Sequence, residues 1–169
     1  MEKINILVVE DNKEEQNAAI EQLSETGNDI TIVGSFNEAM RAMENKKYDV
    51  LLTDIFFPFG FDDESYYPLQ TPNEARKPEA LGYPLMWMAM QKGIRKIGAI
   101  SDANHHSGAL AAMTDYLINE KKVGGDNLFA EVFIFIKRRY DTPEDKKDWL
   151  RVLKTVLGEE VIKEYGNDF

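Results

Sequence analysis

The sequence has no cysteine, only two histidines and no long apolar run. Without cysteine, both disulfide bonds and thiolate metal sites are excluded. No apolar stretch approaches the roughly 18 residues that a membrane-spanning helix needs. The N-terminus runs directly into a strand-like segment at residues 4–9, which leaves no room for a signal peptide. We therefore expect a cytoplasmic protein without a membrane segment.

Positive charge is also scarce in this chain. The 20 Lys and Arg residues face 30 Asp and Glu residues, which gives a net charge of −10. Proteins that bind nucleic acid directly carry a basic patch that neutralises phosphates. The basic clusters at 121–122 and 137–139 are short and have acidic neighbours. Direct binding to nucleic acid is therefore not expected.

The chain is long enough for one domain with a substantial core. It has 169 residues, of which 43% are hydrophobic and 30% are charged, as in globular proteins. We expect a domain over residues 1–158 and a C-terminal tail over 159–169, which is too short for an output module.

Strand-like and helix-like segments alternate along the chain. Apolar strand-like runs occupy residues 4–9, 29–33, 48–54, 94–101 and 128–136. A helical pattern follows each of them, and Ser35 and Thr142 are predicted N-caps, while Gly124 and Gly125 are predicted to stop the fourth helix. Five such βα units predict an α/β fold, a parallel sheet with helices on both faces.

A long segment at residues 59–81 interrupts this alternation. It contains four aromatic residues, three prolines and an acidic trio at 62–64. A loop of this length inside a compact domain is either functional or partly disordered. We expect its aromatic side chains, such as Phe59, to pack on the body of the domain.

Polar residues stand where four of the predicted strands end. Glu10 and Asp11 follow the first strand, Asp54 the third, Ser101 the fourth, and Lys137 the fifth. Ligands of open parallel sheets bind beyond the carboxyl ends of the strands. If the first and third strands are neighbours, three carboxylates meet there, and such crowding favours a hard cation such as Mg²⁺.

Each of these residues also has a purely structural explanation. The acids at 10–11 and Ser101 could cap the helices that follow them, Asp54 could form a turn with Pro58, and Lys137 could be an ordinary surface lysine. Capping alone does not account for polar groups at four such strand ends, so the combination favours a functional site.

Five segments also carry the motifs of one known family. Residues 6–12 (ILVVEDN) and 54–58 (DIFFP) resemble the acidic pair and the phosphoacceptor motif of response-regulator receiver domains, which are CheY-like. Residues 82–86, 97–101 and 133–137 are similar to the start of the third helix, the fourth strand with its terminal hydroxyl, and the fifth strand with its lysine. The resemblance implies a flavodoxin-like, doubly wound five-stranded parallel sheet of strand order 2-1-3-4-5.

The resemblance also implies a function in two-component signal transduction. Asp54 would accept a phosphoryl group from a histidine kinase or phosphotransfer protein. Asp11, Asp54 and the backbone carbonyl of Phe56 would bind Mg²⁺, and Glu10 would act through a bound water. The protein would signal by contact with a downstream protein. It would not be an enzyme beyond self-phosphoryl transfer and autodephosphorylation.

In the same family, a hydroxyl and a lysine contact the phosphoryl oxygens, and Ser101 and Lys137 match these positions. Lys137 is followed by Arg138 rather than proline and lies farther from Ser101 than is usual. Lys121 and Lys122 therefore remain alternatives for the site lysine.

Two other functions stay open from the sequence. One is a receiver-like interaction module that is not phosphorylated. The other is a phosphatase of the haloacid dehalogenase type, which wants a second acid two residues after the nucleophile, where this chain has Phe56. We interpret His105 and His106 as surface residues, because adjacent side chains on a helix point in different directions. The cluster of Met86, Trp87, Met88 and Met90 is expected to pack in the core and at an interface rather than to form a cofactor site.

Overall fold

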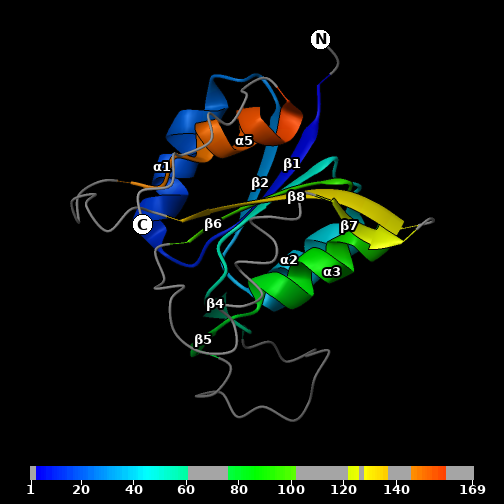
Figure 1. Cartoon of the computed structure of the whole chain (residues 1–169). Coiled ribbons are helices and arrows are strands. Elements are labelled where there is room, and N and C mark those ends of the chain that lie inside the picture. Colours follow the sequence, from blue (N-terminus) through cyan, green and yellow to red (C-terminus); the bar gives the residue numbers. More distant parts are fainter. Residues whose placement is uncertain (1–2, 61–75, 102–121, 126–127, 137–145, 159–169) are drawn as a thin grey trace, which may run out of the picture.

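A single sheet with helices on both faces forms the centre of the protein (Figure 1). This computed structural model describes residues 3–60, 76–101, 122–125, 128–136 and 146–158. The sheet has the strand order β2-β1-β3-β6-β8-β7. Its strands are β1 (Asn5–Val9), β2 (Asp29–Val33), β3 (Val50–Thr53), β6 (Lys96–Ser101), β7 (Lys122–Gly125) and β8 (Leu128–Ile136).

The first five strands in this order are all parallel to one another. They are the five strands that the sequence predicts, and the predicted order 2-1-3-4-5 is confirmed with β6 and β8 as the fourth and fifth. β7 is an additional edge strand, antiparallel to β8.

Four described helices cover the two faces of the sheet. Figure 1 shows α1 (Lys13–Ser24) and α5 (Trp149–Leu157) on one face, and α2 (Phe36–Asn45) and α3 (Gly82–Gln91) on the other. Alternating side chains of β1 supply both cores, with Leu7 and Val9 packed toward α2 and α3, and Ile6 and Val8 packed toward α1 and α5. All four are fully buried, as expected for a parallel strand covered on both faces.

The starts of the first two helices agree with the sequence. Asn12 caps α1 by accepting hydrogen bonds from the backbone of Glu14 and Glu15, and Ser35 caps α2 by accepting one from Glu38. The Glu38 carboxylate accepts the N–H of Gly34, one residue earlier than a standard capping box requires. These caps fix the direction in which the chain leaves β1 and β2.

Two local predictions were wrong. Gly124 and Gly125 are not a helix stop, because they belong to β7 and pair with Phe129 and Leu128 of β8. The paired ends of β7 and β8 are two residues apart in the sequence, a spacing typical of a β-hairpin. The two glycines therefore indicate a hairpin and not the end of a helix. The fourth predicted helix, including the two histidines, lies outside the described residues.

The last helix also begins later than predicted. Residues 146–148 are not helical, and α5 begins at Trp149 with Asp148 as its N-cap, accepting the N–H of Arg151 at 3.0 Å. The predicted cap at Thr142 lies outside the described residues. Lys147 therefore belongs to the connection before the helix and not to the helix itself.

The two ends of the 59–81 segment are joined by a small antiparallel ladder. β4 (Phe57–Pro58) pairs with β5 (Pro78–Glu79), and the N–H of Gly82 then donates to the Ile55 carbonyl at 2.9 Å. Phe59 stacks on Phe36 of α2 with ring centroids 5.1 Å apart, which confirms the expected packing for this aromatic residue. The other aromatic residues of the segment lie outside the described residues.

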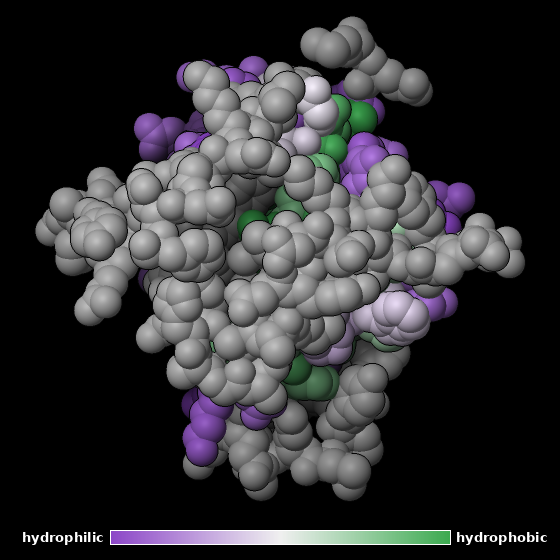
Figure 2. All heavy atoms as spheres, in the orientation of Figure 1, coloured by the Kyte–Doolittle hydropathy of each residue, from purple (hydrophilic) through white to green (hydrophobic). Residues whose placement is uncertain are grey.

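The described surface is mixed in polarity. The described residues that are visible in Figure 2 include both hydrophobic and hydrophilic ones, and the hydrophilic ones lie mainly around the outline of the face shown. Among the described helices, none is both long and apolar enough to cross a membrane.

The predicted domain limits at residues 1–158 and 159–169 stay a prediction.

Candidate functional site

The acids predicted from the strand ends lie together at the carboxyl edge of the sheet. β1 and β3 are neighbours, with Val9 opposite Thr53, so Glu10 and Asp54 emerge side by side. The N–H of Asp54 donates to the Val9 carbonyl at 2.8 Å, which extends the ladder to the acid itself. Carboxylate oxygens of Glu10, Asp11 and Asp54 all lie within 4.8 Å of one another.

The Asp54 carboxylate is held in one orientation by the backbone that follows it. Its Oδ1 accepts the N–H of Ile55 at 2.5 Å and that of Phe56 at 3.3 Å. Its Oδ2 lies 2.7 Å from the Nζ of Lys147. Asp54 is 5% exposed, so nearly all of its contacts are with protein atoms.

Lys147 supplies the positive charge of the site. Its Nζ also lies 2.5 Å from Oε2 of Glu10, and the lysine side chain is only 3% exposed. Its ammonium is 5.8 Å from the ring centroid of the fully buried Trp149. Lys147 was not among the predicted site residues, because the predicted start of the last helix at Thr142 put it inside the helix.

Burial and charge shift the pKa values of these groups in consistent directions. Burial raises the pKa of Glu10 to about 7, against the opposing charge of Lys147. Asp11 is an exposed residue, but nearby protein atoms partly desolvate its carboxyl group and raise its pKa. Burial alone would lower the pKa of Lys147, but the charges of Asp54 and Glu10 outweigh it and raise that pKa. The ammonium is therefore charged at neutral pH.

The other predicted site residues are placed as follows. Ser101 is the last residue of β6 and is 1% exposed, at the same edge of the sheet as Asp54. Phe56 follows Asp54 and directs its N–H at that carboxylate. Lys137 comes directly after β8 and lies outside the described residues, so its role stays a prediction.

Of the two alternative lysines, Lys121 also lies outside the described residues. Lys122 is the first residue of β7 and stands opposite Glu131 of β8. Glu131 is in turn opposite Lys96, the first residue of β6, so Lys122 lies level with the amino end of that parallel strand. This backbone position is about 17 Å along β8 from the carboxyl edge, too far for a lysine of the site.

The acidic cluster has the chemistry that Mg²⁺ requires. Magnesium binds oxygen ligands, most often one or two carboxylates completed by water and substrate oxygens. Glu10, Asp11 and Asp54 offer such oxygens within a small volume, and Asp11 provides access from solvent. The residues present therefore fit the ion.

A groove among the described residues lies beside this site. It has a volume of about 500 Å³ and runs beside the edge strand β2, between α1 and α2. Its lining residues are Gln16, Ile32, Val33, Gly34, Glu38, Arg41 and Ala42. Two of its lining residues bind the backbone of Glu10: the side-chain amide of Gln16 donates to the Glu10 carbonyl at 2.6 Å, and the Val33 carbonyl accepts the N–H of Glu10 at 3.0 Å.

Solved structures with the same fold are receiver domains. The chain is similar to a CheY-like response-regulator receiver domain from Methanospirillum hungatei JF-1, with a TM-score of 0.56 and 19% identity over 94% of this chain and 96% of that one. It is also similar to a response-regulator receiver protein from Sinorhizobium medicae WSM419, with a TM-score of 0.54 and 18% identity over 93% and 96%. The protein thus has the receiver-domain fold.

Sequence comparison gives a shorter match. No protein-family model matches the chain. A stretch of 56 residues, 33% of the chain, is 41% identical to Probable histidine kinase 1 of Oryza sativa subsp. indica. The match covers only 6% of the kinase's length.

Proposed function

We propose that this protein is a phospho-accepting receiver of a two-component signalling system, with Asp54 as the acceptor. One observation carries the proposal, the convergence of three carboxylates and the buried ammonium of Lys147 at the carboxyl edge of a receiver fold. The short match to a histidine kinase supports a histidine kinase or a phosphotransfer protein as the donor.

The chemistry proposed for Asp54 is nucleophilic attack on phosphorus. An Asp54 oxygen forms the new P–O bond, the P–N bond of the donor phosphohistidine breaks, and the imidazole nitrogen keeps the electron pair. The N–H groups of Ile55 and Phe56 orient the attacking carboxylate. Lys147, and Ser101 at the end of β6, are the proposed contacts of the phosphoryl oxygens, with Lys147 in the role first given to Lys137.

Glu10, Asp11, Asp54 and the Phe56 carbonyl would hold Mg²⁺. When bound, the ion neutralises the clustered acids and the oxygens of the incoming phosphoryl group. Hydrolysis of the acyl phosphate by water resets Asp54, so the protein turns over only its own phosphoryl group. The proposal includes a cytoplasmic location and a downstream protein as the target of the signal.

The test is phosphorylation of Asp54→Asn by acetyl phosphate in the presence of Mg²⁺. Intact-mass analysis should show one added phosphoryl group on the unmodified protein and none on the variant. Asp49→Asn is the control, because Asp49 is an exposed aspartate that accepts the N–H of Asn5 at the other end of β3. Labelling that persists in Asp54→Asn would move the acceptor elsewhere.

The alternative is a receiver-like interaction module without phosphorylation. Beryllofluoride with Mg²⁺ separates the two, because it mimics a phosphoryl group on an aspartate without needing a donor. Amide chemical shifts near Asp54 and Ser101 should change in a phospho-accepting protein. If neither acetyl phosphate nor beryllofluoride acts on the unmodified protein, the interaction module is the better description.

A further inference from the structure

The backbone around Lys147 has no regular secondary structure of its own. Residues 146–148 belong to neither β8 nor α5, so the N–H and carbonyl of Lys147 are not held by the hydrogen bonds of a strand ladder or of a helix. Asp54, by contrast, follows β3 directly, and its N–H is held by β1. A long lysine side chain in such a connection has many accessible rotamers, and fixing one of them costs conformational entropy. Something outside the connection must hold Lys147 in place.

Two side chains of α1 make those contacts. Glu15 Oε2 accepts the N–H of Lys147 at 2.9 Å, and Gln22 Nε2 donates to the Lys147 carbonyl at 2.9 Å. The same Gln22 accepts the N–H of Leu150 at 3.2 Å through its Oε1. Both backbone polar groups of the lysine are therefore bound by side chains that lie two helical turns apart on one face of α1.

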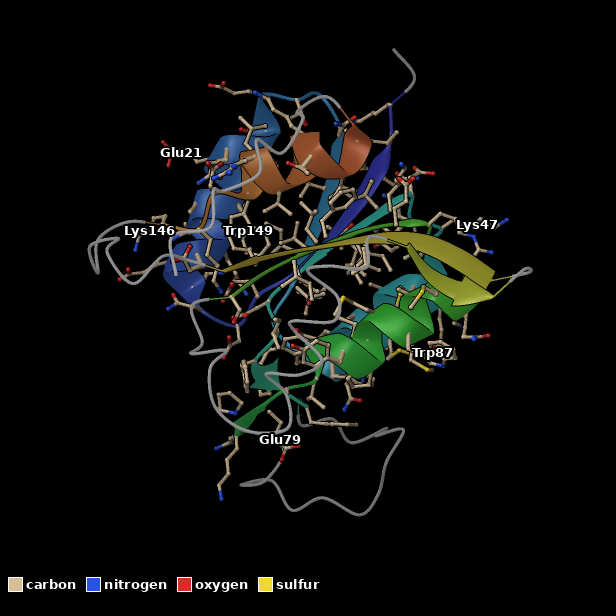
Figure 3. All side chains as sticks on the ribbon, viewed as in Figure 1. Glu21, Lys47, Glu79, Trp87, Lys146 and Trp149 are labelled. Carbon is tan, nitrogen blue, oxygen red and sulfur yellow. The ribbon has the colours of Figure 1, made fainter. Side chains whose placement is uncertain are left out.

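Burial strengthens the contribution of these hydrogen bonds to the position of Lys147. Glu15 is 9% exposed and Lys147 is 3% exposed, so the hydrogen bond between them is shielded from water. A buried N–H left without its acceptor destabilises the folded state, because the group has also lost its hydrogen bonds to water. The exposed pair of Lys146 and Glu14, with Nζ and Oε2 2.5 Å apart, lies on the solvent side of the same contact. Figure 3 shows Lys146 and Trp149, on either side of Lys147 in the chain, on the α1 and α5 side of the sheet.

We infer that Glu15 and Gln22 are positioning residues, which hold the backbone at Lys147 so that its ammonium stands between Glu10 and Asp54. This inference rests on the proposed function for its consequence, since the ammonium is a proposed contact of the phosphoryl group. The position of the ammonium is a property of the protein that can be measured whether or not Asp54 is phosphorylated.

Acetylation of lysines followed by mass spectrometry measures that position. Lys147 of the unmodified protein should react at least tenfold more slowly than the exposed Lys146. Gln22→Leu and Glu15→Leu should each raise the rate at Lys147 at least fivefold relative to that at Lys46, which lies on the opposite side of the sheet in α2's C-cap. Glu15→Gln keeps an acceptor oxygen and should restore protection close to that of the unmodified protein.

Asn28→Ala is the matched control. Asn28 also binds a distant backbone N–H, that of Ile4 at 3.3 Å, but its hydrogen bonds with described residues join it to Ile4 and Thr26 and not to residues 146–148. If this variant exposes Lys147 as much as Gln22→Leu does, or if Lys147 stays protected in both leucine variants, the inference is wrong. Should Glu15→Leu fail to fold, Gln22→Leu at its half-buried position still decides.

Phosphorylation by acetyl phosphate is the second readout. Gln22→Leu should slow the labelling of Asp54 severalfold, and Glu15→Gln should leave it close to normal. If the unmodified protein is not labelled at all, the proposed function fails, and the acetylation rates alone still test whether α1 positions Lys147. If Lys147 becomes exposed in Gln22→Leu but the labelling rate of Asp54 does not change, the position of Lys147 does not affect phosphorylation.

Discussion

At the scale of single residues, the site is an arrangement of buried charges. One ammonium stands between two carboxylates, with Lys147 2.5 Å from Glu10 and 2.7 Å from Asp54. All three side chains are at most 7% exposed, so water screens them little. Removing the cation would leave the buried Asp54 carboxylate beside Glu10 without a compensating charge, in a medium of low dielectric constant. Lys147 therefore stabilises the fold in addition to any role in phosphorylation.

Lys147→Met should lower the free energy of unfolding by about 3 kcal/mol in Mg²⁺-free buffer, because removal of one partner from a buried ion pair is strongly destabilising. Chemical denaturation measures this loss. Lys46→Met is the control, because Lys46 pairs with Asp29 at a surface where both side chains are at least 33% exposed. That pair should contribute less than about 1 kcal/mol. Equal losses in the two variants would contradict the argument.

The acids of the site could be predicted from the sequence, but the lysine could not. Glu10 and Asp54 follow apolar strands, and neighbouring parallel strands bring their carboxyl ends together whatever the loops do. Lys147 is fixed by contacts with Glu15 and Gln22, which are more than a hundred positions away in the chain. No local pattern encodes such contacts. The one available signal was Asp148 as a helix cap, which would have left Lys147 in the connection.

At the scale of elements, the first residue of α3 lies against the backbone of Asp54 and Ile55. Gly82 is the first residue of the helix, and its N–H donates to the Ile55 carbonyl. A Cβ at this position would lie 2.6 Å from the carbonyl oxygen of Asp54 and 2.7 Å from the Cα of Ile55. Both neighbours are backbone atoms, which cannot move aside without disturbing the site.

Gly82→Ala should therefore destabilise the protein by about 2 kcal/mol, as expected for an added methyl group in a filled interior. It should also shift the amide resonances of Ile55 and Phe56, whose N–H groups hold Asp54. Gln91→Ala at the exposed end of the same helix should change stability by less than about 0.5 kcal/mol. A stable Gly82→Ala protein with unshifted resonances would show that α3 does not constrain the site.

The element predictions held where burial dictated the pattern. The parallel strands are apolar because helices cover both faces, so β1 and β2 could be located from composition alone. β7 was missed because its sequence is short and contains two glycines, which are poor strand formers. The start of α5 was misplaced because Thr142 and Pro143 match the sequence pattern of a helix start, whereas residues 146–148, where Lys147 contacts α1, are not helical.

At the scale of the whole molecule, stability depends on the protonation of Glu10. Its pKa is about 7 in the folded protein, above the ordinary value of 4.5. Between these two values the folded state binds more protons than the unfolded state, so this group's contribution to stability falls as pH rises through that window. Mg²⁺ requires the deprotonated carboxylate, so its stabilising effect should change with pH in the opposite sense.

Thermal unfolding with and without Mg²⁺ tests this coupling. Free Mg²⁺ at ten times its dissociation constant should add about 1.4 kcal/mol to the stability of the protein. The same Mg²⁺ concentration should raise Tm clearly more at pH 8 than at pH 5.5, since its affinity falls as Glu10 becomes protonated. Glu10→Gln should remove most of this pH dependence. A rise in Tm that is equal at both pH values would exclude Glu10 as the coupled group.

The stem of the 59–81 segment has a consequence for protein engineering. The β4–β5 ladder and the bond from Gly82 to Ile55 return the chain to its departure point before α3 begins. Phe59 and Gly60 are anchored separately, through backbone and side-chain hydrogen bonds with Asn37 of α2. The hydrogen bonds that join the two ends of this segment to the fold are therefore made by residues up to 60 and from 78 onward. A foreign peptide or a small reporter domain grafted between these positions should leave the β4–β5 ladder and the bond from Gly82 to Ile55 in place.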